Sequence, residues 1–79
     1  VHVHDKIIVV SCGTGSQCIQ WLGFVGIARY DEQNLQGWLQ LGKPLKILLS
    51  SGVVLNNTDA ICEVLQDKEH VYIETSRHP

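Results

Sequence analysis

The apolar residues of this chain occur in short runs of strand length, separated by turn-forming residues. The two longest runs are Ile7–Val10 and Leu45–Leu49, and Lys46 interrupts the second. A membrane-spanning helix needs about 20 consecutive apolar residues, so we expect no such helix and no membrane partner. The chain has 79 residues, enough for one domain and too few for two. The sequence therefore predicts a single small domain over residues 1–79, with residues 76–79 as a tail.

Composition limits the partners that such a domain can have. Hydrophobic residues make up 44% of the chain and charged residues 18%, which is typical of a folded domain. Six basic and eight acidic residues give a net charge of −2, so the chain lacks the basic excess that holds a phosphate backbone. We therefore expect a folded domain with no nucleic-acid partner.

Cysteine usage and the absence of a leader indicate the setting of the domain. Cys12, Cys18 and Cys62 are odd in number and too sparse for a disulfide framework, so we expect buried free thiols in a reducing, cytoplasmic compartment. The chain has no methionine and no signal-like leader. We therefore expect it to be a segment of a longer protein.

The first quarter of the chain predicts a strand and a turn. Lys6–Cys12 is a β-branched run whose four consecutive apolar residues favour the centre of a sheet. Val1–His4 alternates and either extends this strand or frays. Gly13–Ser16 predicts a hairpin turn. Gln17–Leu22 is then either the returning strand or the start of a helix capped by Ser16.

Residues 24–41 combine helical spacing with glycines. The glycines oppose a helix. The apolar spacing nevertheless favours one that ends before Pro44, since proline cannot continue a helix. Its apolar face would consist of Val25, Ala28, Leu35, Trp38 and Leu39.

The second half has clearer signals, in the order strand, turn, short strand, short helix and closing strand. We expect Asn56, Asn57 or Thr58 to cap the short helix. The segments are Leu45–Leu49, Ser50–Gly52, Val53–Leu55, Asp59–Leu65 and Val71–Thr75.

Residues 44–75, which read PLKILLSSGVVLNNTDAICEVLQDKEHVYIET, resemble the end of a ubiquitin-like β-grasp domain. Within that superfamily the stretch is similar to CIDE-N domains and doublecortin repeats, which share the turn at Gly52 and a leucine, here Leu65, before an acidic turn. The resemblance implies an α+β domain with a mixed sheet, one main helix and a short helix. Its expected core includes Ile7, Val9, Ile47, Leu49, Ile61, Leu65, Val71 and Ile73.

Several members of the superfamily present a surface to other proteins, so the resemblance implies a non-catalytic interaction module of a larger intracellular protein. In a β-grasp sheet the strands that carry Lys6 and Lys46 are expected to be neighbours, away from an acidic helix and turn. Opposed basic and acidic faces would then support binding to a protein partner or head-to-tail self-association. The alternative is an ordinary solvated surface. The acidic residues concerned are Asp59, Glu63, Asp67 and Glu69.

Two other functions stay open on the sequence. The doublecortin likeness implies a domain that binds tubulin and microtubules. His2 and His4, two residues apart on a strand, would share a face and with Cys12 or Cys18 would bind zinc. No histidine and acid are placed by the sequence beside Cys12 or Cys18, so we expect no enzyme, no catalytic residue and no cofactor.

The aromatic residues predict core packing more than recognition. They lack interleaved basic residues, which argues against a platform for stacking bases. Any tryptophan that stays exposed would be a candidate hot spot for a protein partner. The aromatic residues are Trp21, Phe24, Tyr30, Trp38 and Tyr72.

Overall fold

The computed structural model describes residues 1–66 and 68–78, and within them it is a compact α+β domain. Its described helices are α1 (Ile19–Tyr30), α2 (Trp38–Leu41) and α3 (Ile61–Val64). Its described strands are β1 (His2–Val3), β2 (Lys6–Ile7), β3 (Pro44–Leu49) and β4 (Val71–Thr75).

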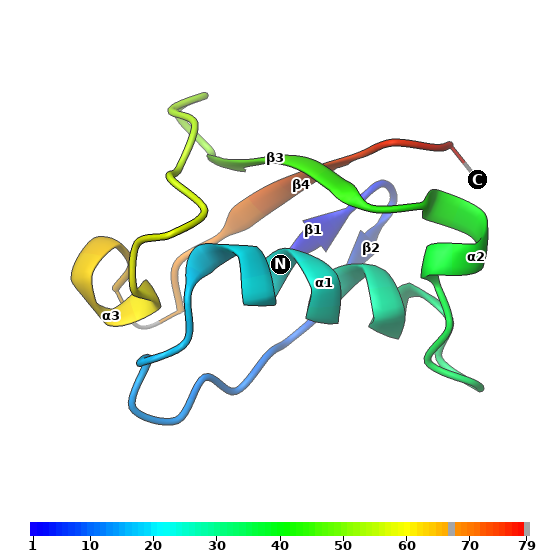
Figure 1. Cartoon of the computed structure of the whole chain (residues 1–79), viewed down its shortest axis with the longest axis horizontal. Coiled ribbons are helices and arrows are strands. Elements are labelled where there is room, and N and C mark those ends of the chain that lie inside the picture. Colours follow the sequence, from blue (N-terminus) through cyan, green and yellow to red (C-terminus); the bar gives the residue numbers. More distant parts are fainter. Residues whose placement is uncertain (67, 79) are drawn as a thin grey trace.

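The four strands form one mixed sheet in the order β2-β1-β4-β3. The central pair, β1 and β4, is parallel, and each is antiparallel to its outer neighbour. Helix α1 lies across one face of this sheet, with α2 and α3 towards opposite ends of the molecule (Figure 1). Among the described residues, no helix has the length and apolar character that crossing a bilayer requires.

The prediction of a central strand over Lys6–Cys12 is wrong. The central strand is β1, and a tight turn in which His4 has a φ of 53° sends the chain back as the edge strand β2. Because β2 ends at Ile7, the rest of the apolar run lies outside the sheet. Ile7 and Val9 are 65% and 86% exposed, so neither belongs to the core.

Of the two alternatives for Gln17–Leu22, the structure has the helix. Gly13 and Gly15 have positive φ and form a turn that leads towards α1, so they do not close a hairpin. The N-cap of α1 is Cys18, not Ser16, and it makes no side-chain capping bond. The entry to α1 is held by backbone pairing with the segment before α3: Ile19 N donates to Asp59 O at 2.9 Å, and Ile61 N donates to Gln17 O at 2.9 Å.

The glycines of α1 allow the helix to lie close to the sheet. A Cβ atom on Gly23 would lie 2.8 Å from Ile47 Cδ1, and one on Gly26 would lie 2.7 Å from Ile73 Cδ1. Both glycines are buried. The tertiary contact therefore outweighs the cost of about 1 kcal/mol that each glycine imposes on an isolated helix.

The expected helix over residues 24–41 is divided in two. Helix α1 ends at Tyr30, and Gly37 N donates to Ala28 O at 3.2 Å as the chain turns back. A Cβ on Gly37 would collide with the carbonyl oxygen of Ile27, so this return requires glycine. The predicted single apolar face is therefore wrong, and three of its members, Leu35, Trp38 and Leu39, are exposed.

The second half has the expected strands β3 and β4, while the expected short strand and short helix are only partly formed. Strands β3 and β4 cover the expected segments, with β3 starting one residue earlier, at Pro44. The turn at Gly52 has a φ of 91°, and the returning segment Val53–Leu55 makes one isolated bridge, between Val54 and Leu48. Helix α3 is shorter than expected, and its N-cap is Ala60, with no capping bond from a side chain.

The core lies between α1 and the face of the sheet that it covers. Four expected members are buried, namely Ile47, Ile61, Val71 and Ile73, while Leu49 and Leu65 pack half-buried against them. The buried residues that the sequence analysis missed are Val3, Ile19, Leu22, Ile27 and Leu41.

Candidate functional site: the open face of the sheet

The face of the sheet opposite α1 carries a row of apolar and aromatic side chains from five chain segments. Alternation along β4 buries Val71 and Ile73 against α1 and leaves Tyr72 on the other face. Strand register then places His2 and Leu48 beside Tyr72, with Ile7 beyond His2 and Val54 beyond Leu48. We call this set the cross-strand row: Ile7, His2, Tyr72, Leu48 and Val54.

The cross-strand row is open to solvent. Ile7 is 65% exposed, Val54 55% and Tyr72 39%, whereas His2 and Leu48 are half-buried. Lys46 and Glu74, which are register partners, lie exposed on the same face beside Leu48 and Tyr72. The open face therefore has an apolar centre with charged side chains beside it.

His2 is held at the middle of the cross-strand row by two aromatic neighbours. Its ring stacks on Tyr72, with the centroids 4.2 Å apart and the planes 17° from parallel. Its Nε2 also shares a hydrogen bond of 2.8 Å with Nδ1 of His70. Partial burial, and then the charge that His70 can carry, lower the pKa of His2 from its ordinary value. The His2–His70 bond requires at least one of the two rings to be neutral.

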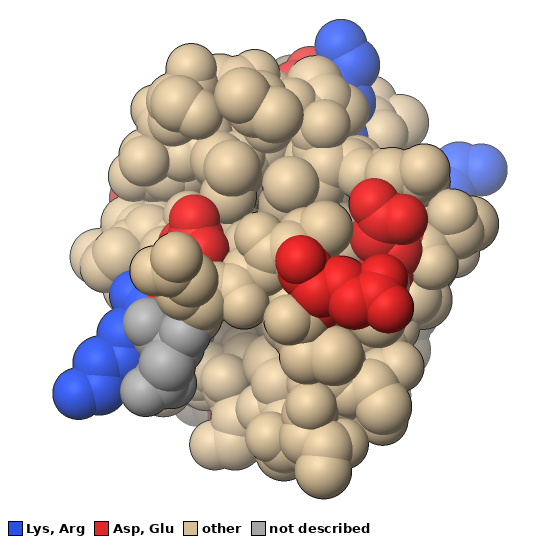
Figure 2. All heavy atoms as spheres, turned by 90° about the vertical axis from the view of Figure 1, so that its left-hand side faces the viewer, with Lys and Arg blue, Asp and Glu red and all other residues tan. Residues whose placement is uncertain are grey.

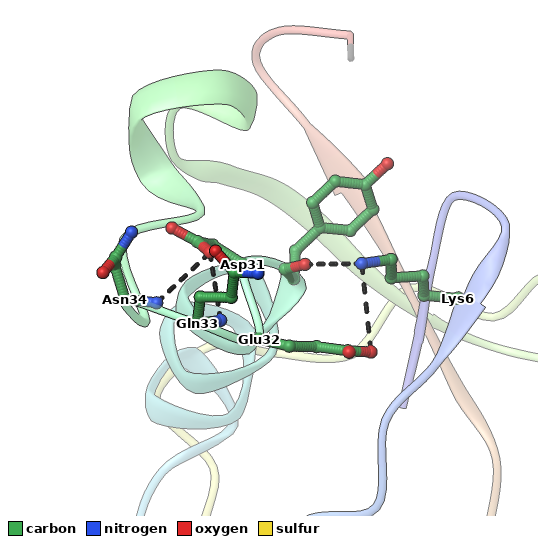
Figure 3. Close-up of polar contacts among 6 residues, drawn as sticks. Lys6, Asp31, Glu32, Gln33 and Asn34 are labelled. Carbon is green, nitrogen blue, oxygen red and sulfur yellow. Dashed lines mark hydrogen bonds and ion pairs between the residues drawn. The ribbon is translucent and has the colours of Figure 1, made fainter.

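Lys6 points to the helix side of the sheet. Its Nζ donates to the backbone carbonyl of Tyr30 at 2.8 Å, lies 4.7 Å from the centre of the Tyr30 ring, and is 4.0 Å from Oε1 of Glu32 (Figure 3). Next to it, Oδ1 of Asp31 accepts backbone hydrogen bonds from residues 33 and 34 (Figure 3). These contacts supply hydrogen-bond partners at the C-terminal end of α1, so Lys6 has a structural role there.

The two lysines that were expected to share a basic region do not come together. Lys6 lies on β2 and Lys46 on β3, and these strands form opposite edges of the sheet. The expectation of neighbouring strands was wrong because both β1 and β4 lie between β2 and β3. Lys6 and Lys46 therefore do not form the basic half of a bipolar surface.

The acidic residues lie towards the α3 end of the molecule. Asp59 precedes α3, Glu63 is within it, and Oε1 of Glu69 accepts a hydrogen bond from Gln66 N at 2.8 Å. Figure 2 shows acidic side chains at separate places on this face, with most Lys and Arg atoms at its outline. Asp67 lies outside the described residues. A role for these acids in binding stays a prediction.

The histidines and cysteines proposed for zinc are not gathered. His4 lies in the turn after β1, where its Nε2 bonds Oγ1 of the buried Thr75 at 2.8 Å, whereas His2 stacks on the open face. The expectation that the two histidines share a face is wrong because β1 ends at Val3. Within residues 1–66 and 68–78, no three His, Cys, Asp or Glu side chains are grouped to hold a metal ion.

The three cysteines are free thiols. Cys12 and Cys18 are half-buried and Cys62 is exposed, so full burial was wrong for all three.

No family model, curated protein or solved structure matches this chain.

The sequence analysis assigned Tyr72 to the core or its edge and did not identify the cross-strand row. The alternation of Val71–Thr75 carried the signal, since a strand with two apolar positions on its buried face must turn Tyr72 the other way. Strand register, which brings His2 beside Tyr72 and Ile7 beside His2, had no counterpart in the sequence pattern.

Proposed function

We propose that this chain is a ubiquitin-like, β-grasp protein–protein interaction module that works without catalysis. The strand order β2-β1-β4-β3, with a parallel central pair and one long helix across it, supports this assignment. The likeness of residues 44–75 to the end of such domains adds to it.

The observation that carries the proposal is the exposed cross-strand row. Aromatic side chains that are stacked and partly buried lose little conformational freedom on binding, which makes the His2–Tyr72 pair a suitable anchor. Ile7 and Val54, each more than half exposed, extend apolar area to both sides of that pair. Burying such a row against a partner would remove apolar surface from water. The favourable free energy is about 25 cal/mol for each Å² of apolar surface buried.

The test compares two single variants of the whole chain as bait for interacting proteins. Tyr72→Ser removes the aromatic anchor, and Leu45→Ser is the matched control, an exposed residue of β3 outside the cross-strand row. We expect a protein that the wild-type chain captures to be lost with Tyr72→Ser and retained with Leu45→Ser. The captured protein, once purified, should show saturable one-to-one binding by titration calorimetry, weakened at least tenfold by Tyr72→Ser.

Three outcomes would contradict the proposal. Capture that is equal for wild-type and Tyr72→Ser would show that the open face is not the binding surface. Cosedimentation with polymerised tubulin that weakens with salt would replace the proposal with the microtubule-binding alternative. Stoichiometric zinc in the purified chain would replace it with the metal-binding alternative.

A further inference from the structure

Helix α1 is apolar on both of its long sides. One side, which includes Ile19, Leu22 and Ile27, is buried against the sheet. The opposite side carries a stripe at i, i+3, i+4 and i+7, formed by Trp21, Phe24, Val25 and Ala28. A helix that is apolar all round is normally enclosed on all sides. Here the second stripe remains accessible, and Phe24 is 49% exposed.

This second stripe forms one wall of a groove of about 850 Å³. The other wall comes from α2, where Trp38 is 48% and Leu39 64% exposed. The volume is within the range of about 300–1,000 Å³ that ligand sites occupy. Both tryptophans of the chain thus line the same surface, which we call the α1–α2 groove.

One part of the α1–α2 groove is cationic. Lys43 and Arg77 are among its lining residues, and no carboxylate is found among the described ones. Backbone bonds fix the two segments together: Ser76 N donates to Lys43 O at 2.9 Å, and Arg77 N donates to Leu41 O at 2.8 Å. Over residues 1–66 and 68–78, neither cation is in an ion pair. Both residues are exposed, so an incoming anion can reach them.

We propose that the α1–α2 groove binds an amphipathic helix of another protein, with apolar side chains on one face and Asp or Glu at one end. A groove between two helices accepts the apolar face of a third, whereas an extended peptide would need a strand edge, which this groove lacks. Carboxylates at the end of the peptide would meet Lys43 and Arg77. In a second copy of this chain, α3 has Glu63 within it and Asp59 before it, but its four residues are too few to fill the groove.

The experiment uses the full chain and two synthetic helical peptides that differ in charge. Both carry Leu and Phe at i, i+3, i+4 and i+7, and one ends in Asp residues where the other ends in Lys. Binding is followed by tryptophan fluorescence, because Trp21 and Trp38 both line the groove. We expect the Asp peptide to bind saturably and at least tenfold more tightly than the Lys peptide.

Variants then test both parts of the groove. Lys43→Glu should weaken the Asp peptide at least tenfold and strengthen the Lys peptide, a reversal that loss of folding cannot produce. Phe24→Ser should weaken both peptides, whereas Tyr72→Ser on the open sheet face should change neither. This inference concerns a different surface from the proposed function, so either can fail alone.

Four results would overturn the inference. Equal binding of the Asp and Lys peptides would mean an unselective apolar surface. Retention of the Asp peptide by Phe24→Ser would place the site elsewhere. Self-association in sedimentation velocity that Phe24→Ser abolishes would assign the groove to a second copy of the chain. Binding of lauric acid with displacement of the Asp peptide would assign it to an amphiphile.

Discussion

The two faces of the sheet are built from the same strands and have opposite properties. On the face towards α1, Val3, Ile47 and Ile73 are at most 6% exposed. On the other face, Ile7 and Tyr72 are 65% and 39% exposed. In β4, successive residues belong to different faces, as the pattern buried, exposed, buried, exposed, buried shows.

This difference separates stability from recognition at the level of single residues. A side chain on the helix side loses water and packs against α1, so changing it alters the free energy of unfolding. A side chain on the open side stays solvated in the free domain, so changing it costs little stability and, under the proposed function, alters chiefly binding. The chain therefore has room to vary one property with little effect on the other.

The strongest challenge to this separation is a pair of adjacent substitutions in β3. Ile47→Ala, on the helix side, should lower the free energy of unfolding by about 2–5 kcal/mol because it leaves a cavity. Leu48→Ala, on the open side and half-buried, should lower it by about 1 kcal/mol. Urea denaturation followed by circular dichroism measures both. Equal losses would show that the two faces do not differ in this way.

A second pair of substitutions tests the close approach of α1 to the sheet. Gly26→Val should cost about 1–3 kcal/mol, since its side chain would meet Ile73 and Val1. Ala28→Val, on the groove side of the same helix, should cost less than about 0.7 kcal/mol, the scale of helix propensity. Thermal unfolding of the two variants gives the comparison. A Gly26→Val protein as stable as wild type would contradict the tight packing described for this side.

The smallest expected effect is a pH dependence that belongs to the open face. The pKa of His2 is lowered in the folded state, so the unfolded chain binds more protons, and stability should rise with pH. The contribution of His2 is therefore present above the ordinary histidine pKa of about 6.5 and is lost as pH falls below it. Urea midpoints between pH 5 and 8 measure the slope, with His2→Gln as the comparison. An unchanged slope in His2→Gln would assign the dependence to other groups.

The sequence predicted the second half of the fold better than the first, for physical reasons. Strands β3 and β4 are runs of five or six residues whose alternation and turn signals are local. Strands β1 and β2 have two residues each, and the turn between them uses His4 at positive φ where a glycine would have given the signal. Helix α1 was obscured because Gly23 and Gly26 serve contacts with the sheet, which no local pattern contains.

The candidate surfaces divide in the same way. The side of β4 on which Tyr72 lies follows from alternation alone, whereas Trp38, expected to pack on an apolar helix face, is exposed. The partners of Tyr72 in the cross-strand row depend on register with β1 and β3. The separation of Lys6 from Lys46 likewise depends on the order of the strands in the sheet, which no local pattern contains.

The parallel pairing of β1 with β4 also has a consequence for how the chain folds. His2 and His70, which meet beside this pair, are 68 residues apart in sequence. Contacts between distant residues form late, because the chain must lose the entropy of closing a long loop before these contacts can stabilise it. During synthesis on a ribosome, the centre of the sheet must stay open until β4 has emerged. Until then, Val3 has no partner in the position that β4 will occupy. The side of α1 that packs on the sheet is also missing its contacts with β4.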